Sequence, residues 1–381
     1  MNILILNNTS DLYGGSKILS IVVKILAEGE HKPIVVLSES GPLVDELAKL
    51  DVDIRIIRLG ILRRKYLSVP GILNRLTVTK NAWKTLNKLI DDNNIDLIYS
   101  NTTGVFIGAF LAKKRKIKHI WHVHEIITKP KAFTKTIGYL LGKYSDNIIV
   151  VSDAVKNHWE KHVLKKPITR IYNGIDTTAF ENTKGVLRQE LNLSEKGILI
   201  AMIGRVNHWK GQDYFIDTAK NILKAHPETK FVMAGDAYTG NEHLVDKLTN
   251  RIQNENLADA IQYIGYRTDI ANILNSVDIF VLPSILPDPF PTVILEAMAS
   301  ATAVVATNHG GAVEMVMENK TGLLIPFDNA QIAADKISDL IAQPAKIAEM
   351  GIEGRKRINN LYSLEAYQKS ILEIFQQTLD V

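Results

Sequence analysis

The sequence predicts an α/β protein built from two doubly wound, parallel-sheet domains. The chain has 381 residues, enough for two domains of ordinary size. Short runs rich in β-branched residues recur at the spacing of strand–helix units, and amphipathic helical patterns such as 16–27 and 43–50 separate them. These runs fall into two series, divided by a polar stretch over 173–195 that has no sustained periodicity.

The first series predicts strands over 3–6, 34–37, 54–57, 97–100, 120–123, 148–151 and 169–172. The second predicts strands over 198–203, 231–234, 261–264, 279–283, 303–306 and 323–326. We therefore place an N-terminal domain at 1–172 and a C-terminal domain at 173–362. Residues 363–381 follow a break and are mostly helical in pattern, so we expect this segment to pack back on the first domain. Two such domains are expected to face each other across a cleft with their strand carboxyl ends.

Composition excludes several classes of protein. Hydrophobic residues make up 46% and charged residues 23%, as in folded globular chains. The absence of cysteine excludes disulfides, thiolate metal sites and a cysteine nucleophile, and it fits a reducing cytoplasm. No apolar run approaches the roughly 20 residues of a membrane span, and the N-terminus is typical of a first strand and not of a signal peptide. We therefore expect a cytoplasmic protein.

The net charge of +4 conceals an uneven distribution. Residues 1–180 hold 27 Lys and Arg against 16 Asp and Glu, whereas residues 181–381 hold 18 against 25. The first domain is therefore expected to meet an anion, either a phospholipid surface or nucleic acid, although solvated surface charges explain part of the bias. The segment 61–88 mixes apolar residues with Arg63, Arg64, Lys65, Arg75, Lys80, Lys84 and Lys88. This pattern favours an anionic membrane over nucleic acid, since no basic groove with interleaved aromatic residues accompanies the charge. The alternative is that its apolar side packs inside the first domain.

Two motifs of the second domain predict a phosphate and sugar site. Gly204-Arg-Val-Asn-His-Trp-Lys-Gly211 joins a strand to a helix, where Arg205 and Lys210 can reach one diphosphate without a metal. Asp288-Pro-Phe-Pro-Thr-Val-Ile-Leu-Glu296 follows another strand and enters a helix, whose first amides form an anion site. The alternatives are a solvated loop for the first motif and a structural pairing of Glu296 for the second.

Signals in the first domain are less specific. Gly14-Gly15 begins a helix after the first strand and can bring amides close to an anion, but the dinucleotide fingerprint Gly-x-Gly-x-x-Gly is absent. His122-Val-His124-Glu125 ends a strand on the cleft side, where a neutral imidazole can donate to a sugar hydroxyl. No third ligand follows at a useful spacing, so we expect no metal there.

Taken together, Gly-Arg-x4-Lys-Gly over 204–211, the acid-x7-Glu pair over 288–296, Ile171–Asp176 and Asp278–Ser284 closely resemble glycosyltransferase family four, the group 1 glycosyltransferases. Gly310-Gly311 through Glu314 and Thr321–Pro326 are similar to the family's next block. The resemblance is strongest over about residues 168–330 and looser in the first domain. It implies a GT-B fold of two Rossmann-like domains, a nucleoside diphosphate sugar bound mainly by the C-terminal domain, and transfer with retention of anomeric configuration.

The resemblance also implies a role for each matching residue. Arg205 and Lys210 would neutralise the diphosphate leaving group, Asp288 would bind sugar hydroxyls and Glu296 the ribose. The segment Phe290, Pro291, Thr292 and Val293 would offer backbone amides to sugar and phosphate. Tyr266 and Arg267 would border the nucleobase, His124 would touch the donor sugar, and an amide at Gly15 would lie near the phosphate. Asp288 replaces a commoner glutamate, Pro291 a glycine, and Ser16-Lys17 an Ala-Glu pair, variants expected to tune substrate choice.

These observations predict a retaining, metal-independent hexosyltransferase with no cofactor beyond its nucleotide-sugar co-substrate. No carboxylate is placed as a covalent nucleophile, which favours same-face attack of the acceptor. We expect a lipid-linked acceptor in surface-polysaccharide or lipopolysaccharide assembly, and an enzyme peripheral on the cytoplasmic face of the membrane. The alternatives are transfer to a soluble acceptor, a nucleotide-sugar epimerase of the same architecture, a dehydrogenase, and an inactive nucleotide-sugar-binding protein. The missing dinucleotide fingerprint disfavours the dehydrogenase, and intact Arg205, Lys210 and Glu296 disfavour the inactive protein.

Overall fold

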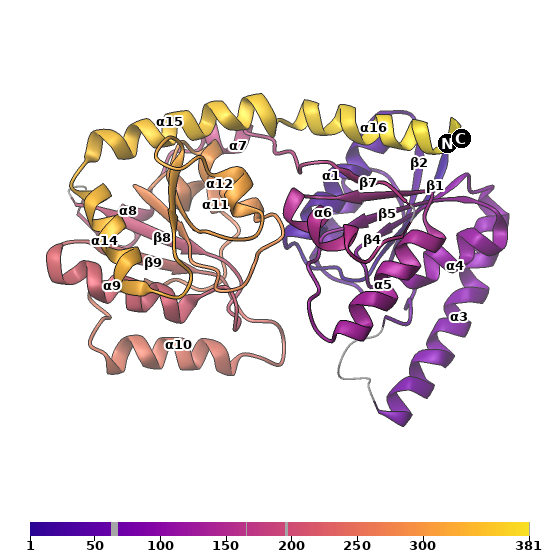
Figure 1. Cartoon of the computed structure of the whole chain (residues 1–381), viewed down its shortest axis with the longest axis horizontal. Helices are drawn as coiled ribbons and strands as arrows, with labels where there is room; N and C mark the ends of the chain where they lie inside the picture. Colours follow the sequence, from indigo (N-terminus) through magenta and orange to yellow (C-terminus); the bar gives the residue numbers. More distant parts are fainter. Residues whose placement is uncertain (62–67, 165, 195–196, 381) are drawn as a thin grey trace. The chain divides into compact units, whose positions relative to one another are not determined.

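The computed structural model describes residues 1–61, 68–164, 166–194 and 197–380, and it divides into two α/β units (Figure 1). Unit 1 comprises Met1–Asn173 and Glu365–Val381, and unit 2 comprises Gly174–Leu364. The predicted boundaries were 172/173 and 362/363. Each unit is a parallel sheet with helices packed on it, so the predicted fold class is confirmed.

The sheet of unit 1 has the order β3-β2-β1-β4-β5-β6-β7, with all pairs parallel. Its strands are β1 (Asn2–Asn7), β2 (Lys32–Leu37), β3 (Asp53–Ile56), β4 (Leu97–Asn101), β5 (Lys118–Val123), β6 (Asn147–Val150) and β7 (Ile168–Arg170). Its helices are α1 (Gly14–Glu28), α2 (Pro42–Ala48), α3 (Val69–Asn93), α4 (Phe106–Arg115), α5 (Lys131–Tyr144), α6 (Asp153–Glu160) and α16 (Leu364–Asp380). The order reverses between β1 and β4, which is where doubly wound sheets open a crevice at their carboxyl edge.

The sheet of unit 2 has the order β10-β9-β8-β11-β12-β13, again parallel. Its strands are β8 (Leu199–Ile203), β9 (Lys230–Ala234), β10 (Ile261–Tyr263), β11 (Ile279–Leu282), β12 (Ala303–Thr307) and β13 (Gly322–Ile325). Its helices are α7 (Thr178–Asn182), α8 (Leu187–Glu190), α9 (Gln212–Ala225), α10 (His243–Asn254), α11 (Ile270–Leu274), α12 (Thr292–Ala299), α13 (Ala312–Met315), α14 (Ala330–Ile341) and α15 (Pro344–Leu361). Here the reversal lies between β8 and β11. All predicted strands are present, with small differences at their ends.

The core of unit 1 explains why its strands are almost wholly apolar. Strands of a parallel sheet are covered on both faces, so their side chains are buried in both directions. One face packs against α1, α2 and α16, and the other against α3 and α4. Helix α16 contributes Tyr367, Ile371 and Phe375 to the cluster that holds Ile3, although hundreds of residues separate them in sequence.

Residues 174–194 of the polar stretch are more ordered than the sequence predicts, because tertiary contacts hold them in unit 2. The amide of Val186 donates to Asn272 Oδ1 at 2.8 Å, and that of Leu187 to Ser276 Oγ at 2.9 Å. The Leu187 side chain is fully buried. The stretch therefore forms the short helices α7 and α8 in place of an unstructured linker. Among the helices of the described ranges, none is long and apolar enough to cross a membrane.

Candidate active site

Two loops of unit 2 meet where the strand order reverses. The loop after β8 carries Arg205 and Lys210, and the loop after β11 carries Asp288. Because β8 and β11 are neighbours, both loops leave the same carboxyl edge of the sheet. Lys210 Nζ donates to Asp288 Oδ2 at 2.5 Å, with side-chain exposures of only 17% and 9%. The structure thus brings together a predicted phosphate-binding cation and a predicted sugar-binding carboxylate that are 78 positions apart.

Gly211 allows the first loop to approach the second. Its φ of +83° lies in the left-handed region, and a Cβ here would lie 1.9 Å from the Pro283 carbonyl oxygen. Asn207 shapes the rest of the turn, since its Oδ1 accepts hydrogen bonds from the amides of Trp209 and Lys210. A residue with a side chain at 211 would force apart the loops that hold Lys210 and Asp288.

The Asp288 loop rests on Gly310 and Gly311, which follow β12. The amide of Gly311 donates to the Asp288 carbonyl oxygen at 2.8 Å. A Cβ at Gly310, whose φ is +62°, would lie 2.4 Å from that same oxygen. His309 ties this segment back to the β11 loop, since its Nε2 lies 2.7 Å from the Ser284 carbonyl oxygen. The Gly-Gly pair seen in the sequence therefore orients Asp288.

Arg205 takes a different position from Lys210. Its guanidinium carbon lies 3.4 Å from the centre of the Tyr238 ring, a cation–π contact with the loop after β9. Its carbonyl oxygen accepts a hydrogen bond from Gln212 Nε2 at 2.9 Å, which couples the loop to the first turn of α9. Both predicted phosphate-binding cations thus lie on one loop, one contacting a carboxylate and the other an aromatic ring.

Helix α12 begins directly after the Asp288 loop. Phe290 is buried against Tyr362, with ring centres 5.9 Å apart, and Pro291 is the residue just before the first turn. Proline has no N–H, so the expectation that Pro291 offers an amide is wrong. The amides of Thr292 and Val293 begin the helix, as predicted. Glu296 lies in the second turn and is 7% exposed.

Tyr266 and Arg267 lie elsewhere in unit 2, on the loop after β10. The Arg267 guanidinium donates to Asp269 and, at 2.9 Å, to Glu190 Oε2, which ties α8 to this loop. Hydrogen bonds to the same carboxylates raise the pKa of Arg267, and Arg267 in turn holds the pKa of Asp269 below its ordinary value. The Tyr266 ring is 52% exposed, so it is the side chain of the pair that can meet a ligand.

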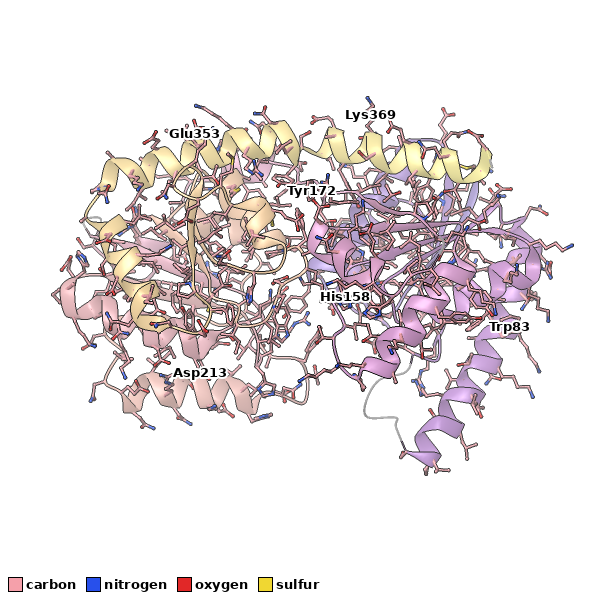
Figure 2. All side chains as sticks on the ribbon, in the orientation of Figure 1. Trp83, His158, Tyr172, Asp213, Glu353 and Lys369 are labelled. Carbon is pink, nitrogen blue, oxygen red and sulfur yellow. The ribbon has the colours of Figure 1, made fainter. Side chains whose placement is uncertain are left out.

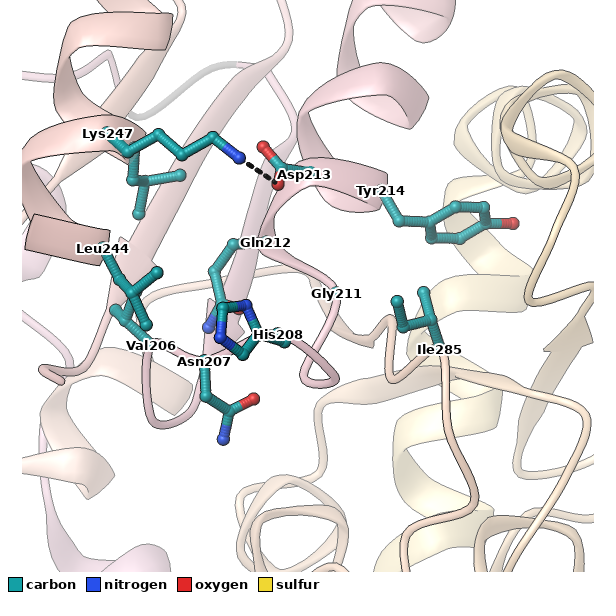
Figure 3. Close-up of a pocket in the computed structure, with 11 residues that line it drawn as sticks. Val206, Asn207, His208, Gly211, Gln212, Asp213, Tyr214, Leu244, Lys247 and Ile285 are labelled. Carbon is teal, nitrogen blue, oxygen red and sulfur yellow. Dashed lines mark ion pairs between the residues drawn. The ribbon is translucent and has the colours of Figure 1, made fainter. Parts of the chain in front are cut away.

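A pocket of about 150 Å³ lies on the flank of the first loop, between that loop, α9 and α10 (Figure 3). Asp213 and Lys247 both line it and form an ion pair, with Oδ2 and Nζ 3.8 Å apart. Arg205, Lys210, Asp288 and Glu296 are not among the described residues that line it. The pocket therefore adjoins the site through Gly211 and Ile285, and the predicted phosphate- and sugar-binding side chains lie outside its lining.

The predicted residues of unit 1 lie at the carboxyl edge of its sheet. His124 follows β5, and its Nε2 lies 2.8 Å from Oδ1 of Asn101 at the end of β4. Asn101 Nδ2 donates to Asn7 Oδ1 at 2.9 Å, at the end of β1. Gly15 adjoins this row, because a Cβ there would lie 3.9 Å from the His124 ring. The structure thus brings together His124 and Gly15, and it adds Asn7, to which the sequence drew no attention.

Burial shifts the pKa values of His124 and of the titratable side chains next to it. It lowers the pKa of His124 to about 4, so the imidazole is neutral at pH 7. It raises the pKa of Glu125 to about 6, although the amides of Thr103 and His124 donate to that carboxylate and oppose the rise. The pKa of His122 is lowered by burial and by the neighbouring His124. A neutral histidine beside buried amides can exchange hydrogen bonds with a sugar, as the sequence suggested.

No set of three or more His, Asp or Glu side chains is arranged to hold a metal ion within the part of the chain that the structure describes. The cations at the site of unit 2 are instead side chains. Whether the reaction needs a metal stays a prediction.

Comparison with known proteins gives matches along both units. Residues 183–357 match the family described as glycosyl transferases group 1, and residues 18–179 match glycosyltransferase family 4. The lipopolysaccharide core biosynthesis mannosyltransferase LpsB of Rhizobium meliloti is 29% identical over 220 residues, which cover 57% of this chain and 62% of that protein. The matched segment is thus less than two thirds of this relative's own length.

Two further comparisons extend over more of the chain. The Escherichia coli UDP-Gal:alpha-D-GlcNAc-diphosphoundecaprenol alpha-1,3-galactosyltransferase is 28% identical over 335 residues, covering 81% of this chain and 82% of that protein. The crystal structure of Anabaena Alr3699/HepE in complex with UDP-glucose superposes with a TM-score of 0.84 at 23% identity, covering 99% of this chain and all of that one. This likeness establishes the fold that the two proteins share.

Proposed function

The chain belongs to the group 1 glycosyltransferases, family four, and from this premise we propose that it transfers a hexose from a nucleoside diphosphate sugar to an acceptor, with retention and without a metal. The observation that supports this most strongly is the contact between Lys210 and Asp288 at the edge of the unit 2 sheet. A diphosphate needs cations and a sugar needs acceptors for its hydroxyl groups. Both are present on adjacent loops, beside the first turn of α12.

The proposed step breaks the bond between C1 of the sugar and the diphosphate oxygen. The acceptor hydroxyl oxygen forms the new bond to C1 on the same face, and its proton passes to the departing phosphate oxygen. Negative charge grows on the diphosphate as it leaves, so Lys210 and Arg205 stabilise the transition state more than the ground state. In this proposal Asp288 binds sugar hydroxyls and Glu296 binds the ribose.

A screen of donors tests the proposal. UDP-glucose, UDP-galactose and GDP-mannose are incubated with the protein, and release of nucleoside diphosphate is measured with and without membrane extracts as acceptor. One donor should be consumed, and a Lys210→Ala/Arg205→Ala variant should be inactive. Lys220→Ala, an exposed lysine of α9 paired with Glu255, is the matched control. Conversion of a donor into another nucleotide sugar would indicate an epimerase, and activity of the double variant within a few-fold of wild type would overturn the phosphate assignment.

Metal independence has its own test. EDTA should leave turnover intact, since the diphosphate charge is met by Lys210 and Arg205. Complete loss of activity that Mg²⁺ or Mn²⁺ restores would contradict this part of the proposal.

We also propose that the acceptor is lipid-linked and that unit 1 contacts an anionic membrane surface, at the cytoplasmic face. The relative from Escherichia coli is named for a diphosphoundecaprenol acceptor. The basic residues of the sequence concentrate in residues 1–180. A lipid-linked substrate with a diphosphate lies at a negatively charged interface, where each nearby basic residue contributes about 1 kcal/mol of attraction.

Helix α3 supplies the surface for this contact. Its first half extends beyond the sheet of unit 1 (Figure 1). Val69, Leu73 and Leu76 lie on one face of this half, at 73%, 59% and 62% exposure. Lys80 and Lys84 continue that face toward the C-terminus and are exposed. The second half of α3 packs on the sheet, through Ala82, Leu86 and Ile90. The alternative that the apolar side of 61–88 packs inside the domain is therefore wrong for Val69, Leu73 and Leu76, although it holds for Leu86.

Trp83, labelled in Figure 2, marks the start of the packed half. The Nζ of Lys114 lies 5.3 Å from the centre of its ring. Arg63, Arg64 and Lys65, which the sequence also assigned to the membrane contact, lie outside the described residues. Lys88 and Lys113 are exposed near the C-terminal ends of α3 and α4. Exposed apolar side chains flanked by cations match the chemistry of an anionic bilayer.

Liposome co-sedimentation tests this surface. Binding should grow with the fraction of anionic lipid and fall with salt. The variant Leu73→Glu/Leu76→Glu should lose binding, whereas the exposed Ile352→Glu variant on α15 of unit 2 should not. If the protein ignores anionic vesicles at low ionic strength, the acceptor is a soluble molecule.

A further inference from the structure

A row of polar side chains crosses the interior of unit 1 at the carboxyl edge of its sheet. Asn7, Asn101 and His124 end or follow three consecutive strands of the sheet order, β1, β4 and β5. Asn7 and Asn101 are 1% and 0% exposed, among strands that are otherwise apolar. Burying a side-chain amide destabilises the fold unless its hydrogen bonds are made. The donor and acceptor of each bond in this row can therefore be assigned in turn, up to the imidazole of His124.

A backbone carbonyl at one end of the row fixes which atom donates and which accepts in each of its hydrogen bonds. Asn7 Nδ2 lies 2.8 Å from the carbonyl oxygen of Thr9, which can only accept. Asn7 Oδ1 therefore faces the other way and accepts from Asn101 Nδ2 at 2.9 Å. The same Nδ2 lies 3.4 Å from the Gly15 carbonyl oxygen, a second acceptor that holds the Asn101 amide in this orientation.

The row ends on the imidazole of His124. With Nδ2 of Asn101 engaged, its Oδ1 is the atom that faces His124 Nε2, 2.8 Å away. An amide oxygen accepts, so Nε2 must carry the hydrogen. Burial keeps this histidine neutral at pH 7, with a pKa of about 4. A neutral imidazole has one N–H only, so Nδ1 retains its lone pair.

The groups around the imidazole are compatible with a neutral ring. The His122 ring stands 4.1 Å away between centroids, and its Nδ1 is 2.5 Å from the Tyr99 hydroxyl. The Glu125 carboxylate accepts from the His124 amide at 3.2 Å, through the backbone and not the ring. A Cβ at Gly15 would lie 3.9 Å from the ring carbon Cγ of His124, so glycine leaves this side of the ring without a side chain.

We propose that Asn101, backed by Asn7, is a positioning residue that fixes His124 in the tautomer protonated at Nε2, so that Nδ1 accepts a hydrogen bond from a hydroxyl group of the sugar substrate. This rests on the proposed function, since the hydroxyl belongs to a sugar. In this hydrogen bond the imidazole accepts from the sugar, whereas the sequence led us to expect that the imidazole donates. Asn101 acts only through His124.

The tautomer can be measured without any substrate. In protein labelled with ¹⁵N-histidine, long-range ¹H–¹⁵N spectra distinguish the two neutral tautomers, and His124→Asn identifies the signal by its loss. The Nε2–H form is expected at pH 7 in wild type. The Asn7→Ala and Asn101→Ala variants should give a mixture, whereas Asn147→Ala, on β6 at the opposite edge of the sheet, should not. An Nδ1–H form or a mixture in wild type would overturn the inference, whatever the activity of the protein.

Two substitutions test whether His124 accepts the hydrogen bond from the sugar at Nδ1. An Asn side chain places its terminal atoms near the Nδ1 position and a Gln near the Nε2 position. His124→Asn can therefore keep the acceptor, and His124→Gln keeps only the contact with Asn101. With the donor that wild type consumes, His124→Gln is expected to have a kcat/KM about tenfold below that of His124→Asn, the value of one ordinary hydrogen bond. The reverse order would overturn the acceptor role.

A pH profile separates positioning from mere structural support. Asn101→Asp places a carboxylate against Nε2–H and raises the pKa of His124, so Nδ1 becomes protonated near neutral pH. Activity should fall near pH 6 and recover toward pH 9, while wild type and Asn147→Asp change little. Loss that no pH restores, in a variant with a wild-type melting curve, would overturn the proposal. If no donor is consumed by wild type but the Nε2–H tautomer is found, the proposed function fails and the tautomer assignment stands.

Discussion

Replacing Lys210 should separate its contribution to stability from its contribution to catalysis. Lys210→Met removes the ammonium group and keeps the apolar stem, leaving the Asp288 side chain, 9% exposed, without the ammonium that contacts it. Removing one partner of a buried ion pair costs about 3–5 kcal/mol. Because 17% of the Lys210 side chain still meets solvent, we expect a loss near the lower end, about 3 kcal/mol at pH 7.

The double variant Lys210→Met/Asp288→Asn distinguishes the two contributions. It contains no isolated buried charge, so its free energy of unfolding should recover by about 1–2 kcal/mol relative to Lys210→Met. Its kcat should not recover, because the cation that stabilises the leaving diphosphate is still missing, a loss of about 100- to 1,000-fold. Urea denaturation followed by circular dichroism gives the first quantity, and nucleoside diphosphate release gives the second. If activity returns together with stability, or the double variant is no more stable than the single one, the reasoning is refuted.

Three further predictions concern neighbouring features. Glu296→Ala should weaken nucleoside diphosphate binding by about 1.5–3 kcal/mol in calorimetry, and unchanged affinity would remove Glu296 from the ribose site. Gly211→Ala should destabilise unit 2 far more than Gly240→Ala, since both have positive φ but only a Cβ at 211 meets backbone, and equal losses would contradict the loop packing. Urea midpoints should fall as pH drops from 6.5 to 4, because the pKa values of His119 and His124 are about 4 and the unfolded chain binds more protons in this window. Glu125, with a pKa of about 6, acts in the opposite sense between about pH 4.5 and 6 and reduces the fall there, so a midpoint that rises as the pH drops would show that burial does not depress the histidines.

The strands were predictable because a parallel sheet buries both of its faces. Runs such as Ile3–Leu6 and Ile279–Leu282 have no polar alternation and are too short for buried helices, so their pattern has one good interpretation. The short helices α7 and α8 were not predictable, since they depend on hydrogen bonds that their amides donate to Asn272 and Ser276, about 90 positions later. The sequence around these helices does not indicate hydrogen-bond partners so far away in the chain.

The site was predictable to the extent that its residues form contiguous motifs. Arg205 with Lys210, and Asp288 with Glu296, lie within single loop–helix segments. The row from Asn7 to His124 has no such signal, because 94 positions separate Asn7 from Asn101 and 23 separate Asn101 from His124. Only the reversal of strand order between β1 and β4 brings these side chains together. A polar residue ending each of several apolar strands was the one clue that the sequence offered.

The most direct test of the proposed transfer follows a single reaction by ¹H NMR, with the donor identified in the screen and an acceptor-containing membrane extract. We expect the nucleotide sugar to disappear while nucleoside diphosphate and a glycoside appear in equal amounts, in the presence of EDTA. The first-formed glycoside should show the same anomeric coupling as the donor. Formation of a glycoside of inverted configuration, or of a new nucleotide sugar with no free diphosphate, would contradict it.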